Sequence, residues 1–230
     1  MAAPLSVVIP TLDAEAGLAR TLSSLALANE GGLLREVVVT DGGSRDATLV
    51  IADEAGCRVV TGPPGRGGQL ARGAEAARGA WMLFLHADTE LEPPWVEEAA
   101  ALIAAGGAAG AFRHAFRTRS GFGRAVSFGA NLRTRAFRLP YGDQGLLISK
   151  AHYARVGGYD DAPLFEDVGL ARRIVREGGR GALEPLRARA VTSADRYERD
   201  GYARRVLRNQ GLLLSYLRGV PPARLAVSYR

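Results

Sequence analysis

The stretch WMLFLHADTELEPPW, residues 81–95, decides the fold. Its first five residues, 81–85, are all apolar, which predicts a central strand covered by helices on both faces of a sheet. His86, Ala87 and Asp88 follow where that strand ends. Side chains alternate along an extended chain, so the polar groups of His86 and Asp88 should point the same way.

Strand and helix signals alternate on the amino-terminal side of this stretch. Short apolar runs predict strands at residues 5–9, 36–40 and 58–61. Helices are expected after Asp13 and after Asp46, each of which can cap a first turn, and also at residues 69–78 and 95–105. This β-α order predicts an α/β fold with a mostly parallel central sheet and helices on both faces.

The second half of the chain is less regular. The patterns predict strands at residues 106–117 and 145–149, and helices at 121–137, 166–177 and 202–218. The 230 residues suit one large domain or two small ones, and no linker or repeat divides them. We therefore expect a single domain over residues 1–230.

Composition limits the class of protein. Hydrophobic residues make up 47% of the chain and charged residues 23%, as in a folded globular protein. The net charge is +6, and residues 113–139 and 204–230 contain arginines but no acids. Such stretches favour phosphates, anionic lipid surfaces or nucleic acid. The arginines are not interleaved with aromatic residues as a base-stacking surface requires, which disfavours nucleic acid.

The amino terminus lacks the basic segment of a secretory signal, and its short apolar run ends at Pro10. No apolar run approaches the roughly 18–20 residues that span a bilayer. Cys57 is the one cysteine, so no intramolecular disulfide can form. These features predict a cytoplasmic protein.

Three polar loops follow predicted strands, at residues 10–15, 41–46 and 86–90. Ligands of such sheets bind beyond the carboxyl ends of the strands, so the loops should meet at one edge. Asp41 can accept hydrogen bonds from a base or ribose, and Gly42 and Gly43 permit close backbone approach. The alternative for this loop is an ordinary Asp-Gly turn.

Two further acidic positions carry the chemistry. Asp88 can hold a hard divalent cation that bridges two phosphates, since Mg²⁺ takes few ligands from protein, or it can simply cap the following helix. Glu166 and Asp167 begin a predicted helix, where the dipole keeps carboxylates ionised. One of them can serve as a general base, or the pair can be a structural N-cap.

These three acidic blocks, in this order, resemble glycosyltransferase family 2 over residues 5–176. The resemblance implies a GT-A fold and inverting transfer of a sugar from a nucleotide-diphosphate donor to a hydroxyl or carboxyl acceptor, with lipids among the candidates. By resemblance Asp41 contacts the nucleotide base, Asp88 is the retained metal ligand of a DXD motif, and Asp167 is the catalytic base with Glu166 as its neighbour. The remaining positions implied at the donor are Pro10, Thr11, Asp13, Glu15, Gly42, Gly43, His86 and Ala87.

The same resemblance divides the chain into a nucleotide-sugar half (1–105), an acceptor half (106–200) and a basic amphipathic tail (201–230). Arg66 and Gln69 lie in the third strand-helix loop, and we expect either a donor contact or an exposed loop there. Asp143 and Gln144, in YGDQG, match a block near the acceptor in related small members. His114 and His152 have no partner at metal spacing and are expected in the core or on the surface.

The sequence departs from the family at two acids. Gly42 replaces a common second acid, and His86 replaces the first acid of DXD. A neutral imidazole suits transition metals, so His86 either favours Mn²⁺ over Mg²⁺ as a ligand or hydrogen-bonds the donor. The RXXRW-type block of processive polysaccharide synthases is missing, which disfavours that class.

Other functions remain open at this stage. A non-catalytic nucleotide-sugar binder fits the loss of two family acids. A sugar-phosphate nucleotidyltransferase shares a related sheet but usually carries a Gly-rich basic first loop, and GRGG at 65–68 is not the dinucleotide-binding signature of a dehydrogenase. The amphipathic segment 202–218 favours either packing on the domain or contact with the inner, anionic face of the membrane.

Overall fold

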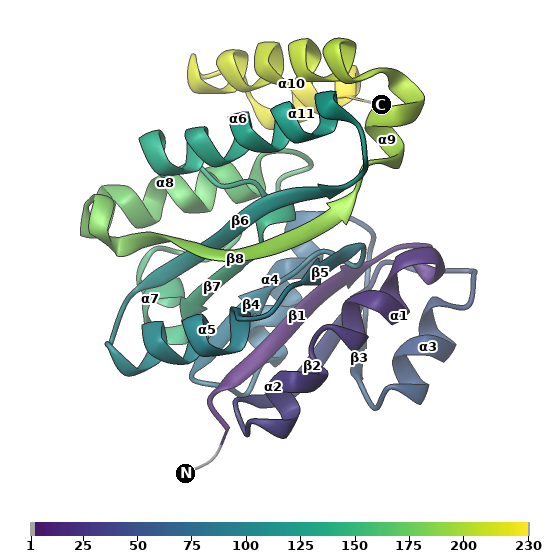
Figure 1. Ribbon diagram of the computed structural model, residues 1–230, viewed down its shortest axis with the longest axis vertical. Coiled ribbons are helices and arrows are strands. Elements are labelled where there is room, and N and C mark those ends of the chain that lie inside the picture. Colours follow the sequence, from purple (N-terminus) through teal and green to yellow (C-terminus); the bar gives the residue numbers. More distant parts are fainter. Residues whose placement is uncertain (1–2, 230) are drawn as a thin grey trace.

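A computed structural model of the protein describes residues 3–229. Its centre is an eight-stranded sheet with the strand order β3-β2-β1-β4-β7-β6-β8-β5 (Figure 1). The strands are β1 (Leu5–Thr11), β2 (Leu34–Asp41), β3 (Arg58–Thr61), β4 (Trp81–Phe84), β5 (Thr89–Leu91), β6 (Ala109–Arg117), β7 (Leu146–Ser149) and β8 (Leu183–Ser193).

Parallel pairing dominates the first half of the sheet. β1 lies between β2 and β4, β2 pairs with β3, and all three pairings are parallel. β7 runs antiparallel to both β4 and β6, whereas β6 and β8 are parallel. The predicted α/β fold with a mostly parallel sheet is therefore confirmed.

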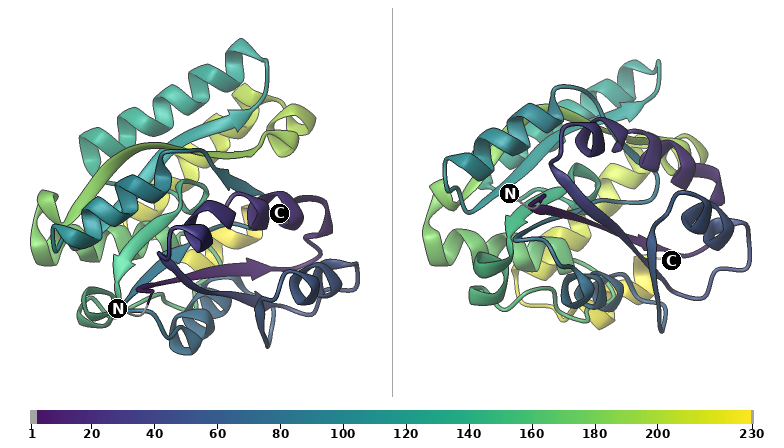
Figure 2. Two further views of the ribbon diagram at one scale, coloured as in Figure 1. Left: turned by 60° about the horizontal axis from the view of Figure 1, so that its bottom comes forward. Right: turned by 90° about the horizontal axis from the view of Figure 1, so that it is seen from below.

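Helices cover both faces of the sheet (Figures 1 and 2). On one face Val7 and Ile9 pack with α1, α2 and α5, and on the other Val8 packs with α4 and α8, as the alternation of side chains requires. The helices are α1 (Glu15–Ser23), α2 (Ala26–Glu30), α3 (Thr48–Glu54), α4 (Arg66–Ala76), α5 (Trp95–Ala104), α6 (Gly121–Phe137), α7 (Lys150–Arg155), α8 (Glu166–Gly178), α9 (Asp195–Asp200), α10 (Tyr202–Leu217) and α11 (Pro222–Tyr229), with short 3₁₀ turns η1 (Gly142–Gln144) and η2 (Arg180–Ala182).

One expected cap is wrong. Asp13 does not cap α1, which begins at Glu15 after Ala14. Asp13 instead adopts a positive φ of 48°, and its Oδ1 accepts a hydrogen bond from Arg45 N at 2.8 Å. Asp46 immediately precedes Ala47, the N-cap residue of α3. Its Oδ1 still accepts a hydrogen bond from Thr48 N at 3.0 Å.

The helix α10 buries some of its apolar residues and exposes others. Leu213 is buried, and Arg205 is buried and paired with Asp200. Leu207 and Leu214 are exposed instead. Among the described residues no helix combines the length and apolarity that crossing a bilayer requires.

Candidate functional site

The loops after β1 and β2 are held together by reciprocal hydrogen bonds. Asp13 N donates to Ser44 Oγ at 2.9 Å, and Glu15 N donates to Asp46 Oδ2 at 3.0 Å. In return, Glu15 Oε2 accepts from Ala47 N at 2.9 Å. The side chains of Asp13 and Glu15 therefore brace this edge of the sheet. Pro10 and Thr11 end β1 beside them.

Asp41 is almost completely buried at the end of β2. Its Oδ2 accepts hydrogen bonds from the backbone of Gly43 and Ser44, both at 2.8 Å, and its Oδ1 accepts from the hydroxyls of Thr11 and Ser44. Burial opposes ionisation of this carboxyl, but these hydrogen bonds outweigh it and lower its pKa. Asp41 is thus a charged group that fixes the Gly42–Gly43 turn, where Gly43 has a φ of 99°.

Gln69, on α4, is buried and bridges three segments. Its Nε2 donates to the carbonyl oxygens of Thr11 and Thr40, both at 2.7 Å, and its Oε1 accepts from Gly65 N at 3.2 Å. A Cβ on Gly42 would lie 3.3 Å from this amide. Gln69 therefore ties β1, β2 and the start of α4 together, with Gly42 packed directly against it.

Arg66, one turn earlier on α4, reaches across to the acceptor half. Its Nε lies 3.0 Å from Glu166 Oε1, and its Nη1 lies 3.4 Å from His86 Nε2. Glu166 is 2% exposed at the side chain, whereas Arg66 is 36% exposed. One guanidinium therefore joins the end of β4 to the start of α8.

The carboxyl group of Glu166 has a raised pKa. Burial and the neighbouring Asp167 raise the pKa of its carboxyl to about 7, although the charge of Arg66 opposes the rise. A carboxyl that exchanges its proton near neutral pH at a cleft marks a functional-site candidate.

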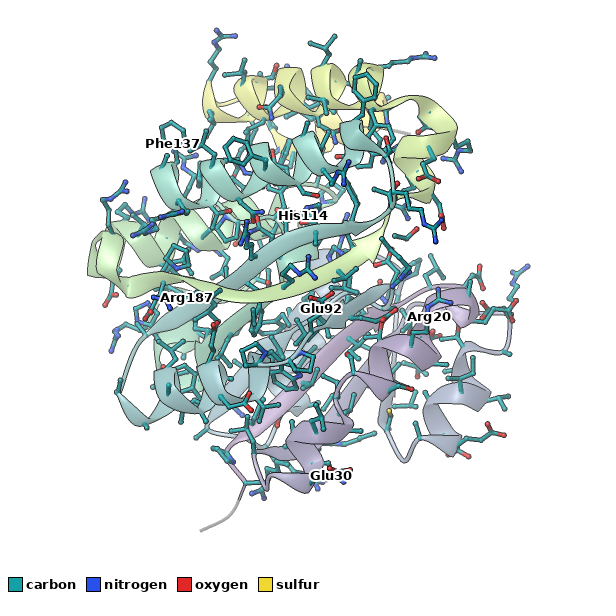
Figure 3. The ribbon with its side chains drawn as sticks, viewed as in Figure 1. Arg20, Glu30, Glu92, His114, Phe137 and Arg187 are labelled. Carbon is teal, nitrogen blue, oxygen red and sulfur yellow. The ribbon has the colours of Figure 1, made fainter. Side chains whose placement is uncertain are left out.

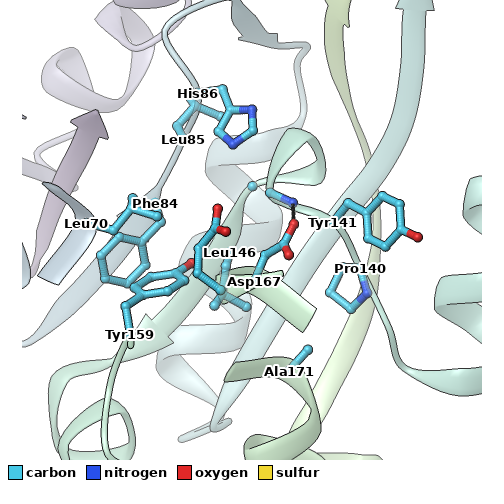
Figure 4. Close-up of a pocket in the computed structure, with 13 residues that line it drawn as sticks. Leu70, Phe84, Leu85, His86, Pro140, Tyr141, Leu146, Tyr159, Asp167 and Ala171 are labelled. Carbon is cyan, nitrogen blue, oxygen red and sulfur yellow. Dashed lines mark hydrogen bonds between the residues drawn. The ribbon is translucent and has the colours of Figure 1, made fainter. Parts of the chain in front are cut away.

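Asp167 opens onto a narrow cavity of about 20 Å³, which Figure 4 shows in close-up. His86, Glu166 and Asp167 all line it, together with Tyr141 and Tyr159. The structure thus brings residues that lie 80 positions apart in the chain to one hollow.

The backbone fixes Asp167 within this cavity. Gly142 N donates to Asp167 Oδ2 at 2.6 Å, the dashed line in Figure 4, and Val168 N donates to Oδ1 at 2.7 Å. A Cβ on Gly142 would lie 2.6 Å from His86 Nε2, so only glycine lets the loop approach this closely. The imidazole and the Asp167 carboxylate therefore face each other across Gly142.

His86 is surrounded by charges of both signs. Burial and the neighbouring Arg66 lower the pKa of its imidazole, against the opposing carboxylates of Asp88, Asp143 and Asp167. A neutral imidazole can hydrogen-bond a ligand or bind a divalent cation.

Asp88 is exposed, beside Ala87, whose carbonyl accepts a hydrogen bond from Thr21 Oγ1 at 2.8 Å. Thr192 Oγ1, on β8, lies 3.5 Å from Asp88 Oδ1. Within residues 3–229 no three His, Cys, Asp or Glu side chains gather as a complete metal cage. One accessible carboxylate does fit a cation that takes its other ligands from phosphates and water.

The two residues predicted at the acceptor differ in exposure. Gln144 is fully buried: its Nε2 donates to Phe112 O at 2.9 Å, and its Oε1 accepts from Thr134 Oγ1 at 2.8 Å. Asp143 is 29% exposed at the side chain, and its Oδ2 lies 3.4 Å from His114 Nε2. Asp143 is thus placed to meet a ligand, whereas Gln144 supports the turn η1.

Comparison with known proteins identifies the family of the chain. The sequence profile described as Glycosyl transferase family 2 matches residues 6–153. The chain belongs to glycosyl transferase family 2. The resemblance inferred from the three acidic blocks is therefore confirmed.

Mycobacterial proteins are relatives of this family 2 chain. It is 40% identical over 99 residues to a "PGL/p-HBAD biosynthesis glycosyltransferase" of Mycobacterium bovis, covering 40% of this chain and 38% of the relative. It is 36% identical over 93 residues to a "Glucosyl-3-phosphoglycerate synthase" of Mycolicibacterium paratuberculosis, covering 36% of this chain and 28% of the relative. The matched segment thus spans well under half of either relative.

Solved structures share the fold at greater length. Glucosyl-3-phosphoglycerate synthase from Mycobacterium tuberculosis, in complex with Mn²⁺ and UDP-glucose, gives a TM-score of 0.65 at 22% identity and covers 95% of this chain and 80% of that one. The same enzyme in complex with Mg²⁺ and UDP gives a TM-score of 0.61 at 23% identity, and the match covers 82% of this chain and 70% of that one. The GT-A fold expected of a family 2 chain is therefore confirmed.

Sequence reasoning missed several residues of this family 2 site. Gly142 and Tyr141 stand beside the acceptor block yet carried no chemical signal of their own. His114, expected in the core or on the surface, is buried, and its partner Asp143 comes from a turn 29 positions away. The pairing of β6 with β7 and the hydrogen bond from Gln144 to Phe112 O hold this turn beside β6.

Proposed function

We propose that this chain is an inverting, metal-dependent glycosyltransferase that moves a sugar from a nucleotide-diphosphate donor to a hydroxyl or carboxyl group. The observation that carries the proposal is the single cavity that His86, Glu166 and Asp167 share beyond the end of β4. Family membership supports the reaction class, and the solved structures that hold UDP or UDP-glucose make UDP-sugars the first donors to test.

Asp167 is the general base in this mechanism. It accepts the proton of the acceptor hydroxyl as that oxygen attacks the anomeric carbon from the face opposite the leaving group. The bond from the anomeric carbon to the diphosphate oxygen breaks, and the nucleoside diphosphate leaves with that electron pair. The hydrogen bond from Gly142 orients Asp167 for this step.

The donor is held by the loops at the edge of the sheet. Asp41 and Gln69 fix the turns at Gly42 and Gly65, so that backbone groups face the nucleoside in a preorganised arrangement. Arg66 offers a cation next to His86, and Ala87 leaves room beside the sugar diphosphate.

A divalent cation, Mn²⁺ or Mg²⁺, would be held by Asp88 with His86 beside it. When bound, it neutralises the charge that grows on the departing diphosphate. The exposed Asp88 carboxylate and the lowered pKa of His86 both fit this role.

Release of nucleoside diphosphate tests the reaction directly. The purified protein, with Mn²⁺ and UDP-glucose but no acceptor, should slowly produce UDP and free sugar. A non-catalytic binder would be stabilised by the donor in a thermal-shift assay but would release no UDP. Absence of both stabilisation and release, across a panel of nucleotide sugars, would refute the proposal.

We also propose cytoplasmic placement with peripheral contact at the anionic inner face of the membrane. Large apolar side chains are exposed on α6, α10 and α11: Phe122, Phe128, Leu132, Phe137, Leu207, Leu214, Leu217 and Val227. Phe137 lies at the end of α6 (Figures 1 and 3). Arginines interspersed on these helices favour anionic headgroups.

A further inference from the structure

A second, larger cavity of about 360 Å³ lies between α6 and α10. Its floor is β6, the strand that carries His114, and Figure 3 shows His114 beneath α6. The helices α6 and α10 contact each other and form its two walls. This volume can hold a small organic molecule.

The walls of this cavity are apolar and aromatic. Phe122 and Val126 project from α6, Val206 from α10, and Tyr197 and Tyr202 close one end. Phe122 is 74% exposed, so the cavity opens to solvent at that residue. A largely apolar molecule with aromatic rings would bury apolar surface here and make edge or face contacts with the phenylalanine and tyrosine rings.

Three buried polar atoms of this cavity have no hydrogen-bond partner among the described residues: Asp143 Oδ1, Tyr141 Oη and Asn209 Oδ1. An unpartnered polar atom away from water is costly, so three of them around one cavity point to a ligand. Two are pure acceptors, so the ligand must bring hydrogen-bond donors.

Neighbouring side chains hold the Asp143 carboxylate in place. Its other oxygen, Oδ2, lies 3.4 Å from His114 Nε2, and His114 Nδ1 lies 3.1 Å from Ser127 Oγ on α6. Burial opposes ionisation of Asp143, but the adjacent His114 and the charge of Arg133 outweigh it and lower the pKa of this carboxyl. The carboxylate is therefore charged and strongly accepting.

The cavity adjoins the catalytic centre. Tyr141 lines both hollows, and its ring points away from Asp167 in Figure 4. The next residue, Gly142, donates to Asp167 and faces His86, and Asp143 follows. A molecule lying between α6 and α10 whose polar end reaches Asp143 thus meets the residue next to Gly142, whose backbone donates to the base.

We infer that this cavity binds the acceptor, and that the acceptor is an amphiphile whose apolar, ring-containing body carries a hydroxyl group. The body lies between α6 and α10, and the hydroxyl end reaches Asp143 beside Asp167. This inference rests on the proposed function, because the bound molecule is an acceptor only if the protein transfers a sugar. The binding site itself is inferred from the cavity and its three unpartnered polar atoms, whatever the reaction.

Calorimetry with a matched pair of probes, 4-hexylphenol and 4-hexylanisole, tests the site without nucleotide or metal. The two share an apolar body, but only the phenol donates a hydrogen bond. A hydrogen bond to a charged group predicts about tenfold tighter binding of the phenol. Asp143→Asn should reduce this preference, because the amide is a weaker, neutral acceptor.

A filling substitution locates the probe. A Cβ at Gly129 in α6 meets nothing within 4 Å, and Gly129 lines the cavity, so Gly129→Leu should fold and weaken both probes about tenfold or more. Gly211→Leu on α10 is the matched control, since its Cβ is equally unobstructed and it does not line the cavity. It should bind both probes like the wild type.

Equal binding of phenol and anisole by the wild type, or undiminished binding by Gly129→Leu, would overturn the inference. Failure of the proposed function gives a different result, because UDP release would then be absent while the probe pattern persists. UDP release without the probe pattern overturns the cavity assignment alone.

Discussion

Gly142 donates its backbone hydrogen to Asp167 Oδ2 at 2.6 Å, across 25 residues of chain. This bond joins the turn before β7 to the first turn of α8. It fixes the rotamer of the carboxylate that we assign as base, in a cavity that also holds His86. Orientation of a base by a backbone donor preorganises it for proton transfer.

Asp167→Asn should abolish most sugar transfer and leave donor binding intact. The amide can still accept from Gly142 but cannot take a proton, so the transfer rate should fall about 10²–10⁴-fold. Steady-state kinetics and donor calorimetry measure the two effects separately. The exposed Asp53→Asn on α3 serves as control and should keep wild-type kinetics. Wild-type transfer by Asp167→Asn would remove the base assignment.

Asp88→Ala should weaken donor binding only when a divalent cation is present. Calorimetry with UDP, with and without Mn²⁺, should show metal-enhanced affinity in the wild type and none in the variant. The expected loss is about tenfold or more, because the cation then keeps no charged protein ligand. Equal enhancement in both proteins would show that the metal binds elsewhere.

Glu166 should make stability depend on pH in a defined window. Its pKa is raised in the fold from 4.5 to about 7, so its contribution is fully present below about pH 4.5 and is lost as pH rises through 7. The full difference is on the order of 3 kcal/mol in the free energy of unfolding. Urea unfolding from pH 5 to 8 should show the decline in the wild type and a flatter profile in Glu166→Gln. Parallel profiles would contradict the raised pKa.

Gln144→Leu should destabilise the fold instead of altering a ligand contact directly. The substitution leaves Phe112 O without its buried partner and leaves Thr134 Oγ1 only its hydrogen bond to Ala130 O, which together cost on the order of 2–4 kcal/mol. Chemical denaturation measures this loss. Gln210→Leu, at an exposed position of α10, should change stability by less than about 0.5 kcal/mol. Comparable losses in the two variants would refute the structural role of Gln144.

Membrane contact through α10 can be tested by flotation. Vesicles with anionic lipid should carry the wild type upward, and Leu207→Ser with Leu214→Ser should reduce association about tenfold or more by removing exposed apolar area. Vesicles of neutral lipid are the control for charge. If the wild type does not float with anionic vesicles, the membrane proposal fails.

The sequence predicted the first half of the fold well, because periodicity there coincides with burial. The mainly buried β1 and β4, and the half-buried β2, differ from their expected ranges by one or two residues at their ends. β3 matches its range although it is largely exposed, and α6 matches in the second half. β8 was missed: two of its buried positions, Ala188 and Ala190, are small, and its sequence contains Pro185, a residue that argues against a strand. β5 has only three residues, too few for a period to appear.

The candidate site was predicted in part for the same reason. Residues at strand ends, such as Asp41 and Asp88, could be placed at one edge by topology. Their exposure could not: Asp41 proves buried and fully hydrogen-bonded, whereas Asp88 is open to solvent. The partners that decide these environments, among them Ser44 and Thr192, come from tertiary packing that no local pattern encodes.

The antiparallel strand β7 brings two stretches that lie far apart in the sequence next to each other. Because it runs opposite to β4, with Phe84 paired to Leu146, the segment entering β7 arrives where β4 ends. The residues proposed to hold the nucleotide and those proposed to meet the second substrate therefore come from separate stretches of the chain and adjoin along one line. Substitutions on the helices α6 and α10 can then alter the proposed acceptor cavity without changing the loops proposed to hold the nucleotide.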